Sequence, residues 1–100
     1  MAQLQIVYWR DIPAQVMVKA GRRNKASREL SLRFTEAIDM AAMRSGAAES
    51  EDYLAEWRRG DPIEVGEDLE AEADKAVAQI EADYDKDRLV ALTKSEGREA

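Results

Sequence analysis

The chain has 100 residues, of which 45% are hydrophobic, 36% charged and 6% aromatic, and its net charge is −6. This length predicts a single domain over residues 1–100, with a hydrophobic core but little room for a deep enclosed cleft. The sequence has no cysteine and no histidine, which excludes disulfide frameworks, thiolate nucleophiles, Cys- or His-ligated zinc and Ser-His-Asp catalysis. We therefore expect a protein that is not an enzyme and that holds no cofactor or metal.

The charge is unevenly distributed along the chain. Residues 1–35 carry seven basic and two acidic side chains, whereas residues 36–100 carry eight basic and nineteen acidic ones. This asymmetry favours a dipolar molecule or two different partners, and the acidic part makes nucleic acid a disfavoured ligand. The N-terminal residues lack the basic and long apolar segments of a signal peptide, and no apolar run reaches the roughly 20 residues of a membrane helix. We expect a cytoplasmic protein without membrane contact.

The pattern of the first twenty residues predicts a β-hairpin over residues 3–20. Apolar side chains alternate from Leu4 to Tyr8 and again over residues 14–20, with the period of two that is typical of strands. The sequence Arg-Asp-Ile-Pro between these segments supplies turn residues. Because proline cannot donate to a strand ladder, Pro13 should begin the second strand at an edge or a bulge.

Two helices are predicted in the middle of the chain, over residues 28–45 and 50–59. Apolar residues recur at helical spacing along the first, and Gly46 lies where a glycine would end it. Ser50 is expected to cap the second, short helix. Met40 and Met43 lie beside the apolar stripe of the first helix. They are interpreted as residues that fill gaps in the core, with an adaptable binding surface as the alternative.

The last part of the sequence predicts an acidic amphipathic helix over residues 67–92 and a frayed tail over 93–100. Residues 62–65 precede this helix and favour a third, short strand. The acidic face is interpreted as a solvated surface, with a docking face for a basic partner as the alternative. The predicted fold class is therefore α+β, in which an N-terminal hairpin packs against two longer helices and one short helix.

A candidate interaction surface combines the hairpin turn with the basic segment 21–28. Its residues are Trp9, Arg10, Asp11, Gln15, Arg22, Arg23, Lys25 and Arg28. An exposed tryptophan beside an arginine is common at binding hot spots. In the alternative interpretation, Trp9 packs against the short helix through Trp57 or Tyr53, and the Arg-Asp pair simply closes the turn.

The basic segment 21–28 has two interpretations of its own. It precedes a predicted helix N-terminus, where backbone N–H groups favour anions, so phosphate or an acidic protein could dock there. It lacks the second glycine and the Lys-Ser/Thr end of a Walker loop. The alternative is an ordinary basic loop.

Four blocks of the sequence resemble the small bacterial domain family called virulence factor. The blocks are YWRDIPAQV, KAGRR, LSLRFTEAIDMAAMRSG and YLAEWRRG. The resemblance covers residues 4–92 and extends to the stand-alone alphaproteobacterial members and to the terminal module of longer proteins named conserved virulence factor. It implies family membership but no catalytic residue or cofactor. It also implies an association with folate- and corrinoid-dependent methyl transfer.

We expect a non-catalytic binding or accessory module that acts through protein–protein contacts, because its polar and aromatic residues gather in a turn of a small chain. One alternative is a small ligand-binding or accessory subunit of a folate- or corrinoid-linked methyl-transfer system that takes an anionic metabolite. Another is an RNA or anion binder that uses the basic segment 21–28. The sequence identifies neither the protein partner nor the oligomeric state.

Overall fold

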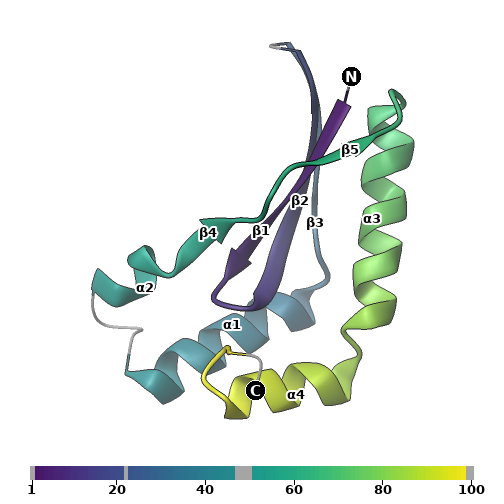
Figure 1. The fold of residues 1–100 in the computed structure, drawn as a ribbon. Helices are drawn as coiled ribbons and strands as arrows, with labels where there is room; N and C mark the ends of the chain where they lie inside the picture. Colours follow the sequence, from purple (N-terminus) through teal and green to yellow (C-terminus); the bar gives the residue numbers. More distant parts are fainter. Residues whose placement is uncertain (1, 22, 47–50, 99–100) are drawn as a thin grey trace.

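The computed structural model describes residues 2–21, 23–46 and 51–98 (Figure 1). The elements in chain order are β1 (Ala2–Trp9), β2 (Ile12–Ala20), β3 (Asn24–Glu29), α1 (Leu32–Ser45), α2 (Glu51–Ala55), β4 (Trp57–Arg59), β5 (Ile63–Val65), α3 (Leu69–Asp83) and α4 (Lys86–Lys94). The predicted α+β class is confirmed, as is the N-terminal hairpin that β1 and β2 form.

The sheet is antiparallel, with the strand order β3-β2-β1-β4, and β5 pairs with the other half of β1. Across the hairpin, Val7 lies opposite Gln15 but Tyr8 lies opposite Pro13. The extra residue, Ala14, therefore forms a β-bulge, which is one of the two settings expected for a proline at this point. The short strand expected near residues 62–65 is confirmed as β5.

The segment predicted as a basic loop leading into a helix at residue 28 is instead a strand. β3 pairs with β2 in a continuous register, and α1 begins only at Leu32. Ala26 and Leu30 are buried on one face, and Arg28, between them, points to the same side. Arg28 is charged although it points inward, and most residues of β3 are polar, so the alternation of apolar and polar residues that is typical of a strand is hidden in the sequence. Pairing with β2, and not local propensity, determines the conformation of this segment.

The short helix predicted over residues 50–59 ends early. Its predicted cap, Ser50, lies outside the described residues, and α2 covers only Glu51–Ala55. The residues that follow form β4, in which Trp57 lies opposite Trp9 of β1. Pairing with β1 satisfies backbone groups that a longer helix would have used, so the tertiary contact determines where α2 ends.

The single acidic helix predicted over residues 67–92 is two helices, α3 and α4, with a break at Tyr84 and Asp85. The carboxylate of Asp85 accepts a hydrogen bond from the N–H of Arg88 at 2.9 Å, so this residue caps α4. The tail predicted to fray from residue 93 is ordered through residue 98, and Gly97 accepts a hydrogen bond from the N–H of Asp11 at 2.8 Å.

The helices cover the sheet along its length and at the end that holds the hairpin turn (Figure 1). α3 runs beside the strands and packs on β2 and β3, while α1 and α4 cross below the hairpin turn and pack against each other (Figure 1). The largest fully buried side chains join these elements and are Trp9, Phe34, Ile12, Ile38, Leu92, Val16, Val18 and Pro13. Within the described ranges, no helix has both the length and the apolar character needed to cross a lipid bilayer.

Candidate functional site

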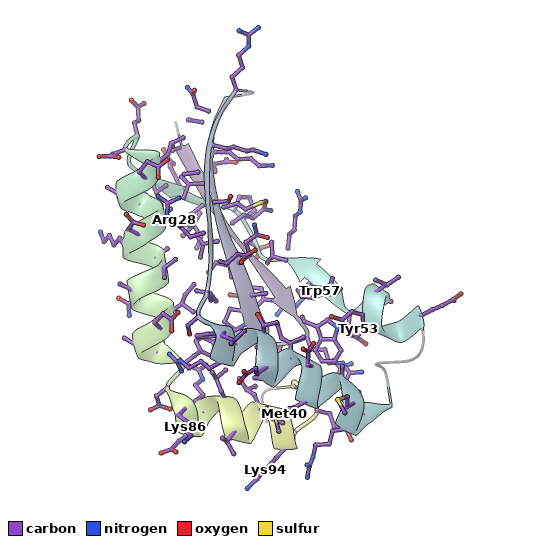
Figure 2. All side chains as sticks on the ribbon, turned by 180° about the vertical axis from the view of Figure 1, so that it is seen from behind. Arg28, Met40, Tyr53, Trp57, Lys86 and Lys94 are labelled. Atoms are coloured by element: carbon purple, nitrogen blue, oxygen red, sulfur yellow. The ribbon has the colours of Figure 1, made fainter. Side chains whose placement is uncertain are left out.

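The side chain of Trp9 is fully buried. Its indole N–H donates to the carbonyl of Tyr53 at 2.9 Å, and the two ring centroids are 5.9 Å apart. Tyr53 in turn packs edge-on against Trp57, at 6.1 Å, where α2 leads into β4 (Figure 2). Packing against the short helix, which was the alternative interpretation of Trp9, is thus what the structure shows.

Arg10 and Asp11 form the turn of the hairpin, and both are tied to other segments. Arg10 is 9% exposed, and its guanidinium donates to the carbonyl of Glu96 at 2.7 Å and lies 3.7 Å from the carboxylate of Glu56. Asp11 forms an ion pair with Arg58 of β4 at 3.3 Å. The turn therefore joins β4 to the C-terminal residues, which is a structural role.

The basic residues of the segment 21–28 point in different directions. Arg22 lies outside the described residues, and Arg23 and Lys25 are exposed at the far end of the sheet. Arg28 instead turns toward α3, where Asp74 accepts from it at 2.9 Å and Glu70 accepts a second hydrogen bond (Figure 2). These hydrogen bonds, from Glu70 first and then Asp74, raise the pKa of the Arg28 guanidinium.

The eight residues of the candidate surface do not converge on one site. The hairpin turn and the basic turn lie at opposite ends of β2, which at nine residues separates them by about 30 Å. Gln15 lies between them, opposite Val7 on one side and Glu29 on the other. This separation follows from β2 alone, because the segments before and after a strand lie at its opposite ends.

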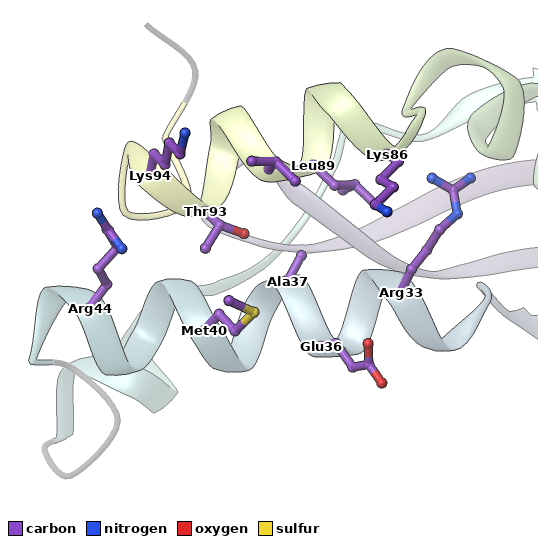
Figure 3. A pocket seen from close by; sticks show the side chains of 10 residues that line it. Arg33, Glu36, Ala37, Met40, Arg44, Lys86, Leu89, Thr93 and Lys94 are labelled. Atoms are coloured by element: carbon purple, nitrogen blue, oxygen red, sulfur yellow. The ribbon is translucent and has the colours of Figure 1, made fainter.

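A groove of about 310 Å³ lies between α1 and α4 (Figure 3). It is lined by Arg33, Glu36, Ala37, Met40, Arg44, Lys86, Leu89, Val90, Thr93 and Lys94. Met40 is 58% exposed and Val90 is 44% exposed, so part of the apolar lining is open to solvent. The expectation that Met40 and Met43 fill gaps in the core is not met, since Met43 is exposed as well.

Cationic side chains stand at both ends of this groove. Figure 3 shows Arg33 and Lys86 at one end and Arg44 and Lys94 at the other. Glu36 is the acidic residue of the lining. An apolar groove between basic ends suits a ligand whose apolar face is flanked by carboxylates. The sequence did not predict this groove, because it forms only where the chain reverses between α3 and α4.

Glu81 of α3 holds the start of α1 in place. Its carboxylate accepts hydrogen bonds from the N–H of Ser31 at 2.7 Å, from the Ser31 hydroxyl at 2.8 Å and from Arg33 at 2.8 Å. Partial burial raises the pKa of Glu81, but the hydrogen bonds from Ser31 and Arg33 outweigh it, so the pKa lies below the ordinary value. Arg33 also donates to the carbonyls of Glu81 and Tyr84, which fixes one end of the groove.

Several carboxylates on the acidic face of α3 form ion pairs or hydrogen bonds with other segments of the chain. Glu70 and Asp74 contact Arg28, and Glu81 contacts Ser31 and Arg33. In the part of the chain that the structure describes, no group of three or more carboxylates is placed to hold a metal ion.

The comparisons with known proteins yield one match. Neither the curated proteins nor the solved structures give a match to this chain. A family model described as virulence factor matches residues 7–93, which include the hairpin turn, β3, α1 and all of α4 except its last residue, Lys94. Since this match spans well over half of the sequence, the chain belongs to the virulence factor family.

Proposed function

We propose that this chain is a non-catalytic accessory module of the cytoplasm that acts through protein–protein contact, and that the groove between α1 and α4 is its docking surface. The observation that carries the proposal is the pair of exposed apolar side chains, Met40 and Val90, set between cationic residues on a chain whose net charge is −6. Contiguous exposed apolar surface rimmed by polar groups marks interaction sites.

The partner that fits this groove is an acidic amphipathic segment of another protein. The α1 residues that line the groove run from Arg33 through Met40 to Arg44, about 16 Å along the helix at 1.5 Å per residue. A partner helix of about three turns has that length, and its apolar face would cover Val90 and Met40, whose flexible side chain adapts to different shapes. Carboxylates beside that face would meet Arg44, Lys86 and Lys94.

The test is affinity purification from the native cell with matched variants. Met40→Glu places a negative charge in the groove, and Leu54→Glu makes a similar change on α2, where Leu54 is 72% exposed and outside the groove lining. We expect Met40→Glu to lose a partner that both wild type and Leu54→Glu retain. Lys94→Glu should weaken the same contact most at low salt, since exposed charges are screened as salt rises. Equal recovery of the partner by Met40→Glu and Leu54→Glu would refute the proposal.

A second candidate function is binding of an anion at the β2–β3 turn. Lys19, Arg23 and Lys25 line one hollow there, together with Gly21 and Asn24. Thermal-shift measurements with phosphorylated and polyglutamyl compounds test it, since a ligand at 100-fold excess over Kd stabilises by about 2.7 kcal/mol. A shift that Lys25→Gln abolishes supports a small anionic ligand, including a folate. Binding of RNA instead would fall steeply with salt concentration, and no shift with any anion removes this candidate.

A further inference from the structure

The outer edge of β3 takes no part in the groove between α1 and α4. β3 ends the strand order β3-β2-β1-β4, so among the residues that the structure describes only one of its sides pairs, with β2. Its register with β2 is continuous from Asn24 to Glu29, without a bulge or a proline. An edge strand of this kind presents a row of backbone N–H and C=O groups to any strand that can align with it.

The register shows which residues point their backbone groups outward. The N–H of Leu30 donates to the carbonyl of Ala14, so these two form a hydrogen-bonded pair. Hydrogen-bonded pairs alternate with non-hydrogen-bonded pairs along an antiparallel ladder. The backbone N–H and C=O groups of the even-numbered residues of β3 therefore point toward β2, and those of Lys25, Ser27 and Glu29 point toward the open edge. The carbonyl of Ser27 accepts a hydrogen bond from the Arg28 side chain at 2.8 Å, which agrees with its outward direction and leaves its second lone pair for another donor.

We propose that two copies of this chain pair through β3, antiparallel and centred on Ser27, so that the two sheets become one. In this register Lys25 of one copy lies opposite Glu29 of the other, and the same pair repeats on the other side of the two-fold axis. Both side chains are exposed in the single chain. A strand with a cation and an anion equally spaced about its centre is complementary to its own antiparallel copy, and opposite charges across strands stabilise the pairing.

The neighbouring side chains are compatible with this approach. Ala26 and Ser27, at the centre of β3, are small. Arg28 would lie opposite Ala26 of the second copy, and its charge is already balanced by Glu70 and Asp74 of its own α3. The groove between α1 and α4 has no lining residue from β3, so self-pairing does not depend on the function proposed above.

A charge-swap experiment on the full chain tests the register. Sedimentation equilibrium over a wide concentration range should show a reversible dimer. Lys25→Glu and Glu29→Lys should each raise the dimer dissociation constant at least tenfold, because each places like charges opposite one another twice. The double variant, Lys25→Glu with Glu29→Lys, should restore the wild-type constant to within a few-fold. Arg59→Glu is the matched control, an exposed charge reversal in β4 at the other end of the strand order, and should leave the dimer unchanged.

Amide hydrogen exchange provides a second readout. The amide of Ser27 should exchange slowly in the dimer and faster in the dilute monomer. A wild-type chain that is monomeric at every concentration overturns the proposal. A dimer that the single variants leave intact, or that the double variant does not restore, overturns it as well, as does a dimer in which the Ser27 amide exchanges as fast as in the monomer.

Discussion

Gly97 packs directly on the indole ring of Trp9, so closely that a Cβ at position 97 would come within 2.9 Å of Cζ3 of that ring. Gly97 has a φ of +88°, and its N–H donates to the carbonyl of Leu92 at 2.7 Å. Its carbonyl accepts from the N–H of Asp11 in the hairpin turn. The turn after α4 therefore covers Trp9 and joins the C-terminal residues to the first two strands.

We predict that Gly97→Ala lowers the free energy of unfolding by about 3 kcal/mol. The left-handed backbone costs an L-residue about 1–2 kcal/mol, and overpacking against Trp9 adds about 1–3 kcal/mol. Urea denaturation measures the change. Another glycine, Gly21, separates the two causes. Gly21 has a φ of +71° but open space around it, so Gly21→Ala should cost about 1 kcal/mol. Equal losses at positions 97 and 21 would contradict the contact with Trp9.

Trp9→Ala is expected to destabilise the protein by about 4 kcal/mol, in the range of large-to-small changes in a core. Trp9→Phe should cost about 1–3 kcal/mol, because it leaves the carbonyl of Tyr53 without its donor. Chemical denaturation checks both values, with near-ultraviolet circular dichroism as a probe of packing. Unchanged stability of Trp9→Ala would show that the indole is not part of the core. Loss of a partner by Trp9→Ala would report unfolding and would not locate an interface.

The elements that could be predicted from the sequence are those whose apolar periodicity and terminal residues lie within the element itself. The β1–β2 hairpin follows from alternation, and the end of α1 follows from Gly46, which has a φ of +77° and donates to the carbonyls of Ala42 and Met43. β3 and β4 could not be predicted in this way. They are short and polar, and the strands beside them, β2 and β1, determine their conformation.

The candidate site was less predictable than the fold because it depends on distant contacts. Trp9 looks exposed when only the hairpin is considered, and Tyr53, 44 residues away, helps to bury it. The groove arises because the chain reverses at Tyr84 and Asp85 and returns α4 to α1. The apolar stripe of α3 ends at Tyr84, and Leu89 and Leu92 resume it with a change of phase. This change was interpreted as a continuation of one helix, whereas a cap at Asp85 separates two.

The cap at Asp85 provides a direct test of this break. We expect Asp85→Ala to destabilise the protein by about 1 kcal/mol, since the N–H of Arg88 would lose its acceptor. Asp85→Asn keeps an acceptor at the same place and should stay close to wild type. Thermal denaturation at neutral pH measures both. In one continuous helix alanine would be favourable at this position, so a stabilising Asp85→Ala would contradict the separation of α3 from α4.

Glu81 makes the stability of the fold depend on pH. Its pKa is lower in the folded chain than the ordinary value of 4.5, since the hydrogen bonds from Ser31 and Arg33 outweigh the opposing effect of partial burial. A carboxyl group of this kind stabilises the folded state above its ordinary pKa. The contribution is lost as pH falls through the folded pKa, because the folded and unfolded states are then both protonated.

Glu81→Gln is therefore predicted to be less stable than wild type by about 1–2 kcal/mol near neutral pH, in the range for hydrogen bonds to a charged group. The difference should shrink steadily as pH falls below about 4.5. Urea denaturation from about pH 7 to about pH 3 measures it. Ser31→Ala removes one of the donors to Glu81, so in that background Glu81→Gln should produce a smaller difference near neutral pH. If the free energies of unfolding of wild type and Glu81→Gln changed with pH in parallel, the charge of Glu81 would contribute nothing to the stability of the fold.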